Sequence, residues 1–573
     1  MEKQDKKTKI IIIGGIAAGT SAAVKARRKS EDLEITIYEK DSFISSGTCG
    51  LPYYVSGKIP EINSLIINTA SGLEKRFNIK VKTLHEVLSI NPYEKNIIVR
   101  DLKTGNEFID NFDKLILATG STPQKLKVNG NNIENVFTLK TIDDAVKLKK
   151  YLDLLEENSR KSADISRSTS IIIVGGGFIG LELLEAFLAK GFKVTIIEKT
   201  NQLLPMFDTE IVEYMENYLI CKGIIITKNM EITDYKLGEE NNSFKTITSV
   251  LTSDGKTIKS DLVFFGIGTR PDTALAQKSG IKIGPSGSII VNEFLQTNFE
   301  YIYAAGDCCE CENAITKEKR SYNLASIANR QGRIAGYNCA GGRQKFIGTL
   351  ATAVIKVLDL TLAKTGISFR EAKKLNPDVA KIELHYPSHA SYYPGASTIH
   401  MLLTFNKADG TILGYQAIGK SMVDKKVDIL SVAIKNKMKL WELANLDLGY
   451  HPEFGAAKDS VNILGMIGEN LKKNEVEFID VEELRDKIKN KEKIVILDVR
   501  TAKEYENGHI EGALLIPIDE LRDNTGKLNK NDEIIIHCRS SYRSYIGYRI
   551  LKNMGFKNVK DLNGSYLSWE RKI

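Results

Sequence analysis

Short apolar runs, each followed by a glycine turn and a helix-like segment, recur along the chain. The run at 10–13 leads through Gly14 and Gly15 into an alanine-rich segment that predicts a helix over about 20–29. The run at 171–174 leads in the same way into a predicted helix ending near Lys190. Uninterrupted runs of this length are typical of parallel strands buried on both faces. The pattern predicts an α/β protein with two Rossmann-like units.

The same pattern continues to the C-terminus, where it restarts after a polar stretch at 469–477. The restart indicates a separate α/β domain at the end of the chain. Further strands are predicted at 34–38 and 193–197 and within 112–123, 261–272 and 301–307; in the last domain a helix is predicted at 481–490, strands from 493 and at 533–537, and a helix at 545–554.

Length and composition indicate a globular protein of several domains. At about 150 residues per domain, 573 residues hold three to five domains. Hydrophobic residues make up 42% and charged residues 27%, which excludes a disordered, collagenous or fibrous chain. The net charge of +8 permits an anionic ligand, but the sequence has no dense Lys/Arg stripe. We therefore expect no nucleic-acid partner.

Cysteine content and hydropathy predict a soluble cytoplasmic protein that does not bind a membrane. Seven cysteines are few and odd in number, which favours reduced thiols over a secreted disulfide framework. The lysine-rich N-terminus and the run at 10–13 imitate a signal peptide, but Gly14 and Gly15 interrupt that run. No apolar stretch reaches the roughly 18 residues of a membrane span.

The first glycine turn has features of a dinucleotide-binding site. Gly14, Gly15 and Gly19 let backbone N–H groups approach a pyrophosphate at a helix N-terminus. Glu39 lies 25 residues after Gly14 at the end of the next predicted strand, where a carboxylate binds ribose hydroxyls. Ile16 stands where the second glycine is expected, so the turn alone also fits a plain strand–turn–helix unit.

The second glycine turn carries the complete pattern. Gly175, Gly177 and Gly180 are followed by Glu198, 23 residues after Gly175. A carboxylate at this position favours the free 2′-hydroxyl of NADH over a 2′-phosphate, and Lys199 beside it weakens that preference. Two such turns in one chain predict two different nucleotides that must meet.

With the segments 112–123, 261–272 and 301–307, these turns make roughly the first 465 residues resemble the flavin-dependent pyridine-nucleotide disulfide oxidoreductases. The resemblance implies FAD on the first turn, NAD(P)H on the second, and Phe178 gating the nicotinamide site. It places Asp307 on the ribityl or phosphate part of FAD. The FAD residues it implies are Gly14, Gly15, Ala17, Ala18, Gly19, Glu39, Lys40, Ala118, Thr119, Gly120, Gly306 and Asp307; the NAD residues are Gly175, Gly177, Phe178, Ile179, Gly180, Glu182, Glu198 and Gly268.

Cys49 distinguishes among members of that family. Glutathione-reductase-like members carry two cysteines in this segment, whereas the next cysteine here is Cys221. A lone thiol beside a flavin forms either a sulfenic acid, as in NADH peroxidases and oxidases, or a mixed disulfide, as in coenzyme A disulfide reductases. Ala17 stands where the peroxidase- and oxidase-like members carry a histidine, which favours the second chemistry.

A basic stripe follows Ala17 and suits an anionic thiol carrier such as CoA. Ser21, Lys25 and Arg28 are spaced to share one helix face. The resemblance to CoA disulfide reductases also implies a dimerisation domain over about 348–464. From it, Tyr392 and Tyr450 would reach the partner subunit's Cys49 and donate to the departing thiolate, with Tyr393 as the alternative to Tyr392. The implied CoA residues are Ser21, Lys25, Arg28, Ser45, Thr48, Asn329 and Lys458, with Thr48 in place of the usual asparagine.

Cys538 is the candidate nucleophile of the C-terminal domain. It ends the predicted strand at 533–537 and begins a loop, 538–543, that runs into a helix. With 498–500 and 504–513, this loop resembles a single rhodanese domain. Converging N–H groups, Arg539 and Arg543 favour a thiolate that can hold a persulfide sulfur, although Ser541 replaces the usual glycine. An inactive docking module is the alternative, and the retained cysteine disfavours it.

The remaining cysteines predict no metal site. Cys308, Cys309 and Cys311 are too close together for tetrahedral ligation, and no paired Cys or His motif lies near them in the sequence. We interpret them as loop cysteines beside the FAD strand, and Cys221 and Cys339 as small buried hydrophobic residues.

The predicted protein is a homodimeric, FAD-dependent reductase of CoA disulfide, CoA persulfide or polysulfide, using NADH, or NADPH as the second option. The CoA arm would shuttle between Cys49 and Cys538. The alternatives are an NADH oxidase or peroxidase with a Cys49 sulfenic acid, and a sulfur-relay binding protein. The expected domains are FAD-binding at 1–125 and 261–345, NAD(P)H-binding at 126–260, α+β dimerisation at 346–468, a linker at 469–477, and rhodanese at 478–573.

Overall fold

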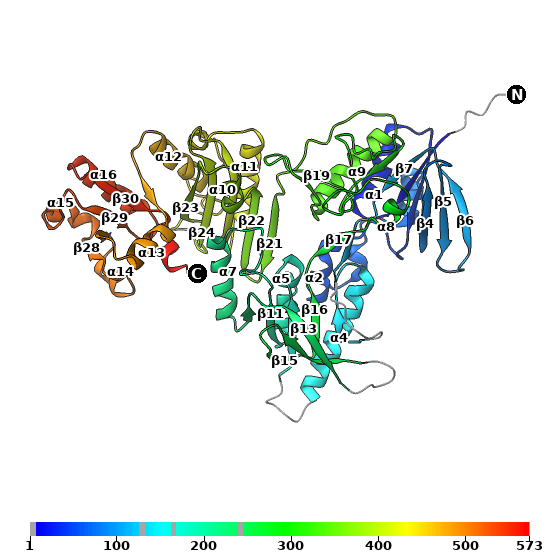
Figure 1. Ribbon diagram of the computed structural model, residues 1–573, viewed down its shortest axis with the longest axis horizontal. Coiled ribbons are helices and arrows are strands. Elements are labelled where there is room, and N and C mark those ends of the chain that lie inside the picture. Colours follow the sequence, from blue (N-terminus) through cyan, green and yellow to red (C-terminus); the bar gives the residue numbers. More distant parts are fainter. Residues whose placement is uncertain (1–6, 125–132, 162–167, 239–244, 572–573) are drawn as a thin grey trace. The chain divides into compact units, whose positions relative to one another are not determined.

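The structure is a computed structural model that describes residues 7–124, 133–161, 168–238 and 245–571. The predicted domain boundary at 125/126 lies outside the described residues. The chain forms two compact units, Met1–Leu203 with Ile224–Ala351 and Leu204–Gly223 with Thr352–Ile573. The predicted α/β fold class is confirmed in both units (Figure 1).

The first unit contains a parallel five-stranded sheet in the order β18-β7-β1-β2-β3. Ile10, Ile11 and Ile12 in its central strand have no exposed surface, as a strand covered on both faces requires. Helix α1 begins at Ala17, three residues before the predicted start, because Thr20 already donates to the carbonyl of Ile16. The elements are β1 (Thr8–Ile13), β2 (Leu33–Glu39), β3 (Lys80–Thr83), β7 (Lys114–Leu117), β18 (Ile302–Ala304), α1 (Ala17–Lys29) and α9 (Ala325–Cys339).

A second parallel sheet follows the order β12-β11-β10-β16-β9. The helix predicted to end near Lys190 is interrupted at Leu183 and forms α5 and α6. Helix α7 (Thr209–Cys221) lies between β11 and β12 in sequence but belongs to the second compact unit. The elements are β9 (Val136–Phe137), β10 (Ser170–Val174), β11 (Lys193–Ile197), β12 (Ile225–Thr227), β16 (Leu262–Phe265), α5 (Phe178–Glu182) and α6 (Leu184–Ala189).

Smaller elements complete the first unit. They are two antiparallel three-stranded sheets, β4-β5-β6 and β13-β14-β15, and the two-stranded pairs β8-β17 and β19-β20. Their bounds are β4 (His85–Asn91), β5 (Asn96–Asp101), β6 (Glu107–Asn111), β8 (Ser121–Pro123), β13 (Ile232–Leu237), β14 (Ile247–Thr252), β15 (Thr257–Lys259), β17 (Thr269–Pro271), β19 (Cys311–Glu312), β20 (Lys319–Arg320), η1 (Thr48–Gly50), α2 (Leu51–Val55), η2 (Ile62–Leu65), α3 (Ala70–Phe77), α4 (Ile142–Lys161) and α8 (Ala274–Lys278).

The second unit begins with an antiparallel sheet in the order β21-β22-β25-β24-β23. Its central strands are apolar, and Leu402, Leu403 and Tyr415 have no exposed surface. Helix α7 packs on β24 and β25. The elements are β21 (Ala353–Val357), β22 (Leu360–Gly366), β23 (Val379–Pro387), β24 (Thr398–Asn406), β25 (Ile412–Gly419), α10 (Phe369–Leu375), α11 (Val423–Lys435), η3 (Leu440–Asn445) and α12 (Ser460–Lys472).

The C-terminal domain has a parallel sheet in the order β26-β30-β29-β27-β28. The segment 469–477 is not wholly a linker, because α12 continues to Lys472 and buries one face. Among the described residues, no helix is both long and apolar enough to cross a membrane. The elements are β26 (Phe478–Ile479), β27 (Ile494–Asp498), β28 (Leu514–Leu515), β29 (Glu533–His537), β30 (Asn558–Leu562), α13 (Val481–Lys489), α14 (Ala502–Glu506), η4 (Ile518–Glu520), α15 (Leu521–Asn524), η5 (Thr525–Lys527), α16 (Tyr542–Asn553) and α17 (Ser565–Glu570).

Candidate functional site

The first glycine turn brings bare backbone to the carboxyl edge of the first parallel sheet. Gly14 has φ +101°, and a Cβ on it would lie 2.2 Å from the Ala118 carbonyl oxygen. A Cβ on Gly19 would lie 1.8 Å from the Gly14 carbonyl oxygen, so α1 packs directly on the turn. Among the described residues, no side chain caps α1 and no acid lies in its first turn. The N-terminal amides of α1 are therefore available to an anion.

Glu39 holds this turn in place from the end of β2. One carboxylate oxygen accepts the Gly15 N–H at 2.7 Å, and the other accepts the Asp41 N–H at 2.9 Å. Burial raises the pKa of Glu39, whereas these two backbone hydrogen bonds work in the opposite direction. The predicted ribose-binding carboxylate thus lies beside the predicted pyrophosphate-binding turn.

Asp307 lies at the same edge of the sheet, just after β18. Its carboxylate accepts a hydrogen bond from Ser121 at 2.9 Å and pairs with Lys140 at 3.5 Å. The neighbouring predicted positions Gly120 and Gly306 have φ values of +70° and +87°, which favour glycine. Lys140 was not predicted from the sequence, because a lysine just before a helix carries no signal of this contact.

The second glycine turn repeats the geometry of the first. A Cβ on Gly175, whose φ is +94°, would lie 2.7 Å from the Gly266 carbonyl oxygen. Glu198 accepts the Gly176 N–H at 2.7 Å, as Glu39 accepts that of Gly15. Lys199 pairs with Glu231 at 2.8 Å, so an opposite charge already engages the cation that weakened the NADH preference.

Cys49 lies on η1 with its side chain exposed to solvent. Desolvation by neighbouring protein atoms raises the pKa of the Cys49 thiol, and the charge of Glu182 raises it further. Lys140 acts in the opposite sense and favours the thiolate. The two charged groups therefore oppose each other at the candidate redox sulfur.

Glu182 forms a hydrogen-bonded pair with Tyr53, which the sequence did not predict. Burial raises the pKa of Glu182 to about 7, against the effect of the Tyr53 hydrogen bond. Desolvation and the charge of Glu182 raise the pKa of Tyr53 to about 12. A carboxyl that titrates near neutrality is thus coupled electrostatically to Cys49.

Replacing Glu182 with glutamine is expected to speed alkylation of Cys49 about threefold at about pH 8. The carboxylate is charged above its pKa of about 7 and there disfavours the thiolate, so its removal lowers the thiol pKa. Iodoacetamide labelling with mass spectrometry of the Cys49 peptide, from about pH 6 to about pH 9, checks the prediction. Glu185→Gln, which removes the partner of Lys58, is the matched control. An unchanged pH profile of Cys49 labelling in Glu182→Gln would contradict the electrostatic coupling between Glu182 and Cys49.

Two predicted CoA residues, Ser21 on α1 and Asn329 on α9, lie side by side. The Ser21 hydroxyl donates to the Asn329 side-chain oxygen at 2.6 Å. The helices approach closely because Gly332 and Gly336 face α1, where a Cβ on either would lie 2.2 Å or less from a backbone oxygen. Lys25 and Arg28 lie on α1 with Ser21: the Lys25 ammonium is 5.1 Å from the centroid of the Tyr337 ring, and Arg28 donates to the Val24 carbonyl. Buried Ser45 accepts from Asn68, Thr48 begins η1, and exposed Lys458 belongs to the second unit.

The two tyrosines predicted at the dimer interface lie together in the second unit. Their hydroxyls, on Tyr392 and Tyr450, are 2.7 Å apart, and the side chains are 76% and 49% exposed. The hydrogen bond raises the pKa of Tyr450. Tyr393 instead contacts Glu453 at 3.4 Å. Tyr392 and Tyr450 therefore form a hydrogen-bonded pair that does not include Tyr393.

Cys538 lies at the end of β29, where its side chain is 1% exposed. Its backbone N–H donates to the Ser565 hydroxyl at 3.2 Å, and the same hydroxyl lies 3.8 Å from its sulfur. Ser541 adopts φ +81°, which explains why glycine is usual there, and α16 begins at Tyr542 inside the predicted loop. Ser565 was missed because its contact with Cys538 spans 27 residues of sequence.

The two arginines of this loop lie in different surroundings. Arg543 donates two hydrogen bonds of 2.7 Å to Glu504. The Glu504 hydrogen bonds raise the pKa of Arg543, and the charge of Cys538 adds to that effect. Arg539 is exposed. Arg543 is therefore engaged by Glu504 and does not serve Cys538 alone.

The predicted burial of Cys339 is confirmed, and three further cysteines are buried as well. Cys308, Cys309, Cys311 and Cys339 are buried, and no cluster in the described ranges could hold a metal ion. The prediction that Cys221 is buried is wrong: it is exposed, because the helix α7 directs its apolar face elsewhere in the second unit.

Comparisons with known proteins match three successive parts of the chain to known families. Residues 8–332 match the pyridine nucleotide-disulphide oxidoreductase family, 352–460 its dimerisation domain, and 480–572 the rhodanese-like domain. An NADH oxidase of Methanocaldococcus jannaschii is 33% identical over 79% of this chain and 97% of its own. A coenzyme A disulfide reductase of Staphylococcus haemolyticus is 31% identical over 80% of this chain and 98% of its own. The solved NAD-dependent persulfide reductase from A. fulgidus is 34% identical, with 98% of this chain and 100% of that chain covered at a TM-score of 0.88.

Proposed function

Because the chain belongs to the pyridine nucleotide-disulphide oxidoreductase family, we propose that it uses NADH to reduce CoA disulfide, CoA persulfide or polysulfide. Cys49 forms the mixed disulfide with CoA, and Cys538 carries sulfane sulfur. The isolation of Cys49 carries the proposal. The other cysteines in the described part of the first unit are buried, with exposures of 0–3%. A thiol with no second exposed cysteine among the described residues of its own unit suits a mixed disulfide with a small-molecule thiol.

Two relatives and the C-terminal domain support this choice of substrates. The S. haemolyticus relative is a coenzyme A disulfide reductase, and the A. fulgidus structure is an NAD-dependent persulfide reductase. The rhodanese-like match spans 480–572 and includes Cys538. A sulfur-carrying cysteine in the same chain as a sulfur-reducing one favours sulfane substrates.

The two glycine turns, each with a carboxylate beside it, fit FAD on the first turn and NADH on the second. A Cβ on Gly14 or Gly175 would collide with a backbone carbonyl, so each turn presents bare backbone to a pyrophosphate. Glu39 and Asp307 would help to hold FAD, and Glu198 would hold the ribose of NADH. FAD, when bound, relays two electrons from NADH to sulfur.

Cys49 acts on CoA disulfide as a thiolate nucleophile. Its sulfur bonds to one CoA sulfur, the original S–S bond breaks, and the electron pair leaves on the second CoA. Tyr450, paired with Tyr392, protonates this leaving thiolate from the partner subunit. Two electrons then cleave the Cys49–CoA disulfide and restore both thiolates.

A homodimer and a cytoplasmic setting fit this mechanism. Residues 352–460 match the family's dimerisation domain, and the exposed hydroxyl pair of Tyr392 and Tyr450 suits a site completed by a second subunit. The seven cysteines of the chain suit a reducing compartment.

The M. jannaschii relative named NADH oxidase favours a second candidate, in which Cys49 cycles through a sulfenic acid. Ala17 argues against it, because no histidine stands there to handle peroxide protons.

NADH oxidation by the FAD-loaded protein tests the proposal. CoA disulfide, CoA persulfide and polysulfide are supplied in turn without oxygen, and oxygen and hydrogen peroxide are supplied as acceptors in separate assays. We expect at least one of these to be turned over about tenfold faster than oxygen or hydrogen peroxide. Oxygen or peroxide rates that equal the sulfur rates would select the oxidase or peroxidase instead.

A further inference from the structure

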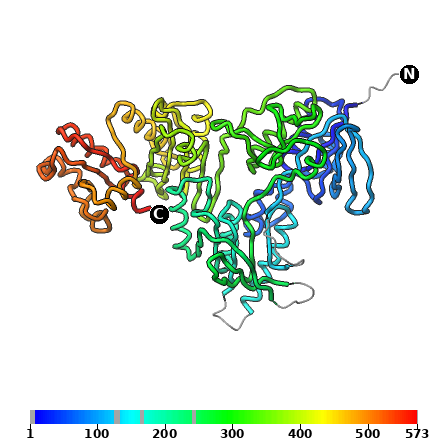
Figure 2. Tube along the Cα trace, viewed as in Figure 1, coloured from blue at the N-terminus to red at the C-terminus, as the bar shows by residue number. Residues whose placement is uncertain are grey.

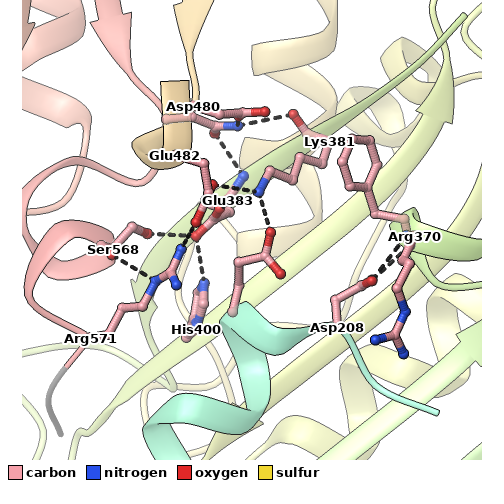
Figure 3. Close-up of polar contacts among 12 residues, drawn as sticks. Asp208, Arg370, Lys381, Glu383, His400, Asp480, Glu482, Ser568 and Arg571 are labelled. Atoms are coloured by element: carbon pink, nitrogen blue, oxygen red, sulfur yellow. Dashed lines mark hydrogen bonds and ion pairs between the residues drawn. The ribbon is translucent and has the colours of Figure 1, made fainter. Parts of the chain in front are cut away.

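A cluster of buried charges joins three parts of the second unit: α7, the edge of the antiparallel sheet and the C-terminal domain (Figure 3). Lys381 on β23 lies at its centre, with its side chain 2% exposed. Its ammonium group contacts Glu210 of α7, Glu383 of its own strand at 3.1 Å and Glu482 of α13 at 3.5 Å. One cation therefore bridges all three parts.

The cluster is a single network rather than a set of separate pairs. Glu383 has no exposed side-chain surface and accepts hydrogen bonds from Ser568 at 2.8 Å and His400 at 3.3 Å. Burial alone would raise the pKa of Glu383, but Lys381 and His400 outweigh it and lower that pKa. Removal of one member leaves the charge of another buried without compensation.

Arg571 adds the second cation and fixes the end of the described chain. Its guanidinium contacts Glu213 of α7 at 2.6 Å and also Glu482 of α13. Its carbonyl accepts from Asn217 of α7 at 2.7 Å. Figure 2 shows this C-terminal segment, in red, beside the trace of α7. The contacts of Arg571 thus tie the C-terminal domain to α7.

Helix α17 connects this network to the loop of Cys538. At one side of the helix, the N–H groups of Tyr566 and Leu567 donate to the carbonyls of Cys538 and Arg539, both at 3.1 Å. At the other side, the Leu567 carbonyl accepts from the Tyr214 hydroxyl of α7 at 2.5 Å. A single residue, Leu567, therefore contacts both the sulfur-carrying loop and α7.

We propose that Arg571 is a positioning residue for Cys538: it clamps α17 to α7 and α13, and α17 in turn holds the loop that carries the sulfur. The proposal rests on the sulfane-carrying role of Cys538 stated above. In that role the Cys538 thiolate attacks the outer sulfur of a persulfide R–S–S⁻, the S–S bond breaks, and R–S⁻ leaves with the electron pair. The loop geometry set through α17 determines how well the buried sulfur is aligned for this attack.

The test compares Arg571→Gln with Lys560→Gln in the FAD-loaded, full-length protein. Lys560 forms ion pairs with Glu483 and Glu533 in the same domain, so Lys560→Gln controls for the loss of a cation away from α17. With polysulfide as donor and CoA as acceptor, we expect Arg571→Gln to lower the kcat of sulfur transfer about tenfold with little change in KM. NADH-dependent reduction of CoA disulfide at Cys49 should stay within about twofold of wild type, and Arg571→Lys should recover part of the loss.

Two further readouts separate positioning from folding and from the proposed function. Hydrogen exchange should rise in Arg571→Gln at 538–541 and 565–571 but not across β27 to β30, and iodoacetamide should label Cys538 faster. Tyr214→Phe, which removes the hydroxyl contacts to the Leu567 carbonyl and to His385 but no charge, should show the same changes on a smaller scale. Unchanged transfer, exchange and labelling in Arg571→Gln would overturn the positioning role. Absence of polysulfide transfer in the wild type would instead overturn the role of Cys538, while labelling and exchange would still test the clamp.

Discussion

Replacement of Cys49 with serine is expected to lower NADH-dependent reduction of CoA disulfide at least about 10³-fold. A serine hydroxyl is a weak nucleophile at neutral pH and forms no disulfide, so neither the mixed disulfide nor its reduction can occur. Steady-state NADH oxidation with CoA disulfide, followed at 340 nm under anaerobic conditions, measures the loss. Because Cys49 does not belong to either glycine turn, the FAD content of the variant should equal that of the wild type.

Cys221→Ser is the matched control, because Cys221 is the other exposed cysteine among the described residues. It lies at the end of α7 in the second unit, and its replacement should leave turnover unchanged. Full turnover by Cys49→Ser would rule out the mixed-disulfide mechanism. Equal losses in both variants would indicate a general effect of removing exposed thiols.

Replacement of Cys538 with serine is expected to lower turnover of polysulfide at least about 100-fold and to leave CoA disulfide reduction unchanged. Sulfane sulfur must reside on a thiolate, and Cys538 is the cysteine at the end of β29 beside the N-terminus of α16. CoA disulfide carries no sulfane sulfur and needs only Cys49. Parallel assays of NADH oxidation with the two substrates separate these requirements.

Serine is close in size to cysteine, so this variant should keep the fold of the buried loop, and its thermal unfolding serves as the control for stability. Ser540→Ala, in the same loop, controls for a small side-chain change, the loss of one hydroxyl group, beside the nucleophile. Unchanged polysulfide turnover in Cys538→Ser would place the C-terminal domain outside the main reaction. The chain would then be a CoA disulfide reductase with a separate sulfur-transfer activity.

Local patterns predicted most of the strands and the glycine turns. The strands at 193–197 and 533–537 have the predicted bounds, because continuous β-branched runs between turn residues specify them. Boundaries set by side-chain packing were less predictable: α1 begins three residues early, α5 and α6 separate at Leu183, and α12 enters the predicted linker. Helix ends depend on capping and burial that the periodicity does not encode.

In the candidate site, too, features set by local sequence were predictable and contacts between distant residues were not. Glu39 and Glu198 could be placed beside their turns from spacing alone, because a strand–helix–strand unit returns the next strand to the side of the first. Tyr53 and Glu182 are 129 residues apart, and Lys140 and Asp307 are 167 apart. Such pairs have no local signature, so the opposing charges around Cys49 became visible only in the folded unit.

The sequence by itself therefore determined the two glycine turns with their carboxylates and the strand–loop–helix unit around Cys538, because neighbouring residues specify each of them. It also identified Cys49 as the candidate redox cysteine, because no second cysteine stands in that segment. Only the tertiary structure decided where α7 belongs, that Cys221 is exposed, and that Lys381 and Arg571 join α7 to the C-terminal domain. The physical reason is that burial and charge pairing depend on which distant segments pack together. A buried cation is tolerated where acceptors converge on it, and at Lys381 these acceptors are carboxylates from three elements that only the fold brings together.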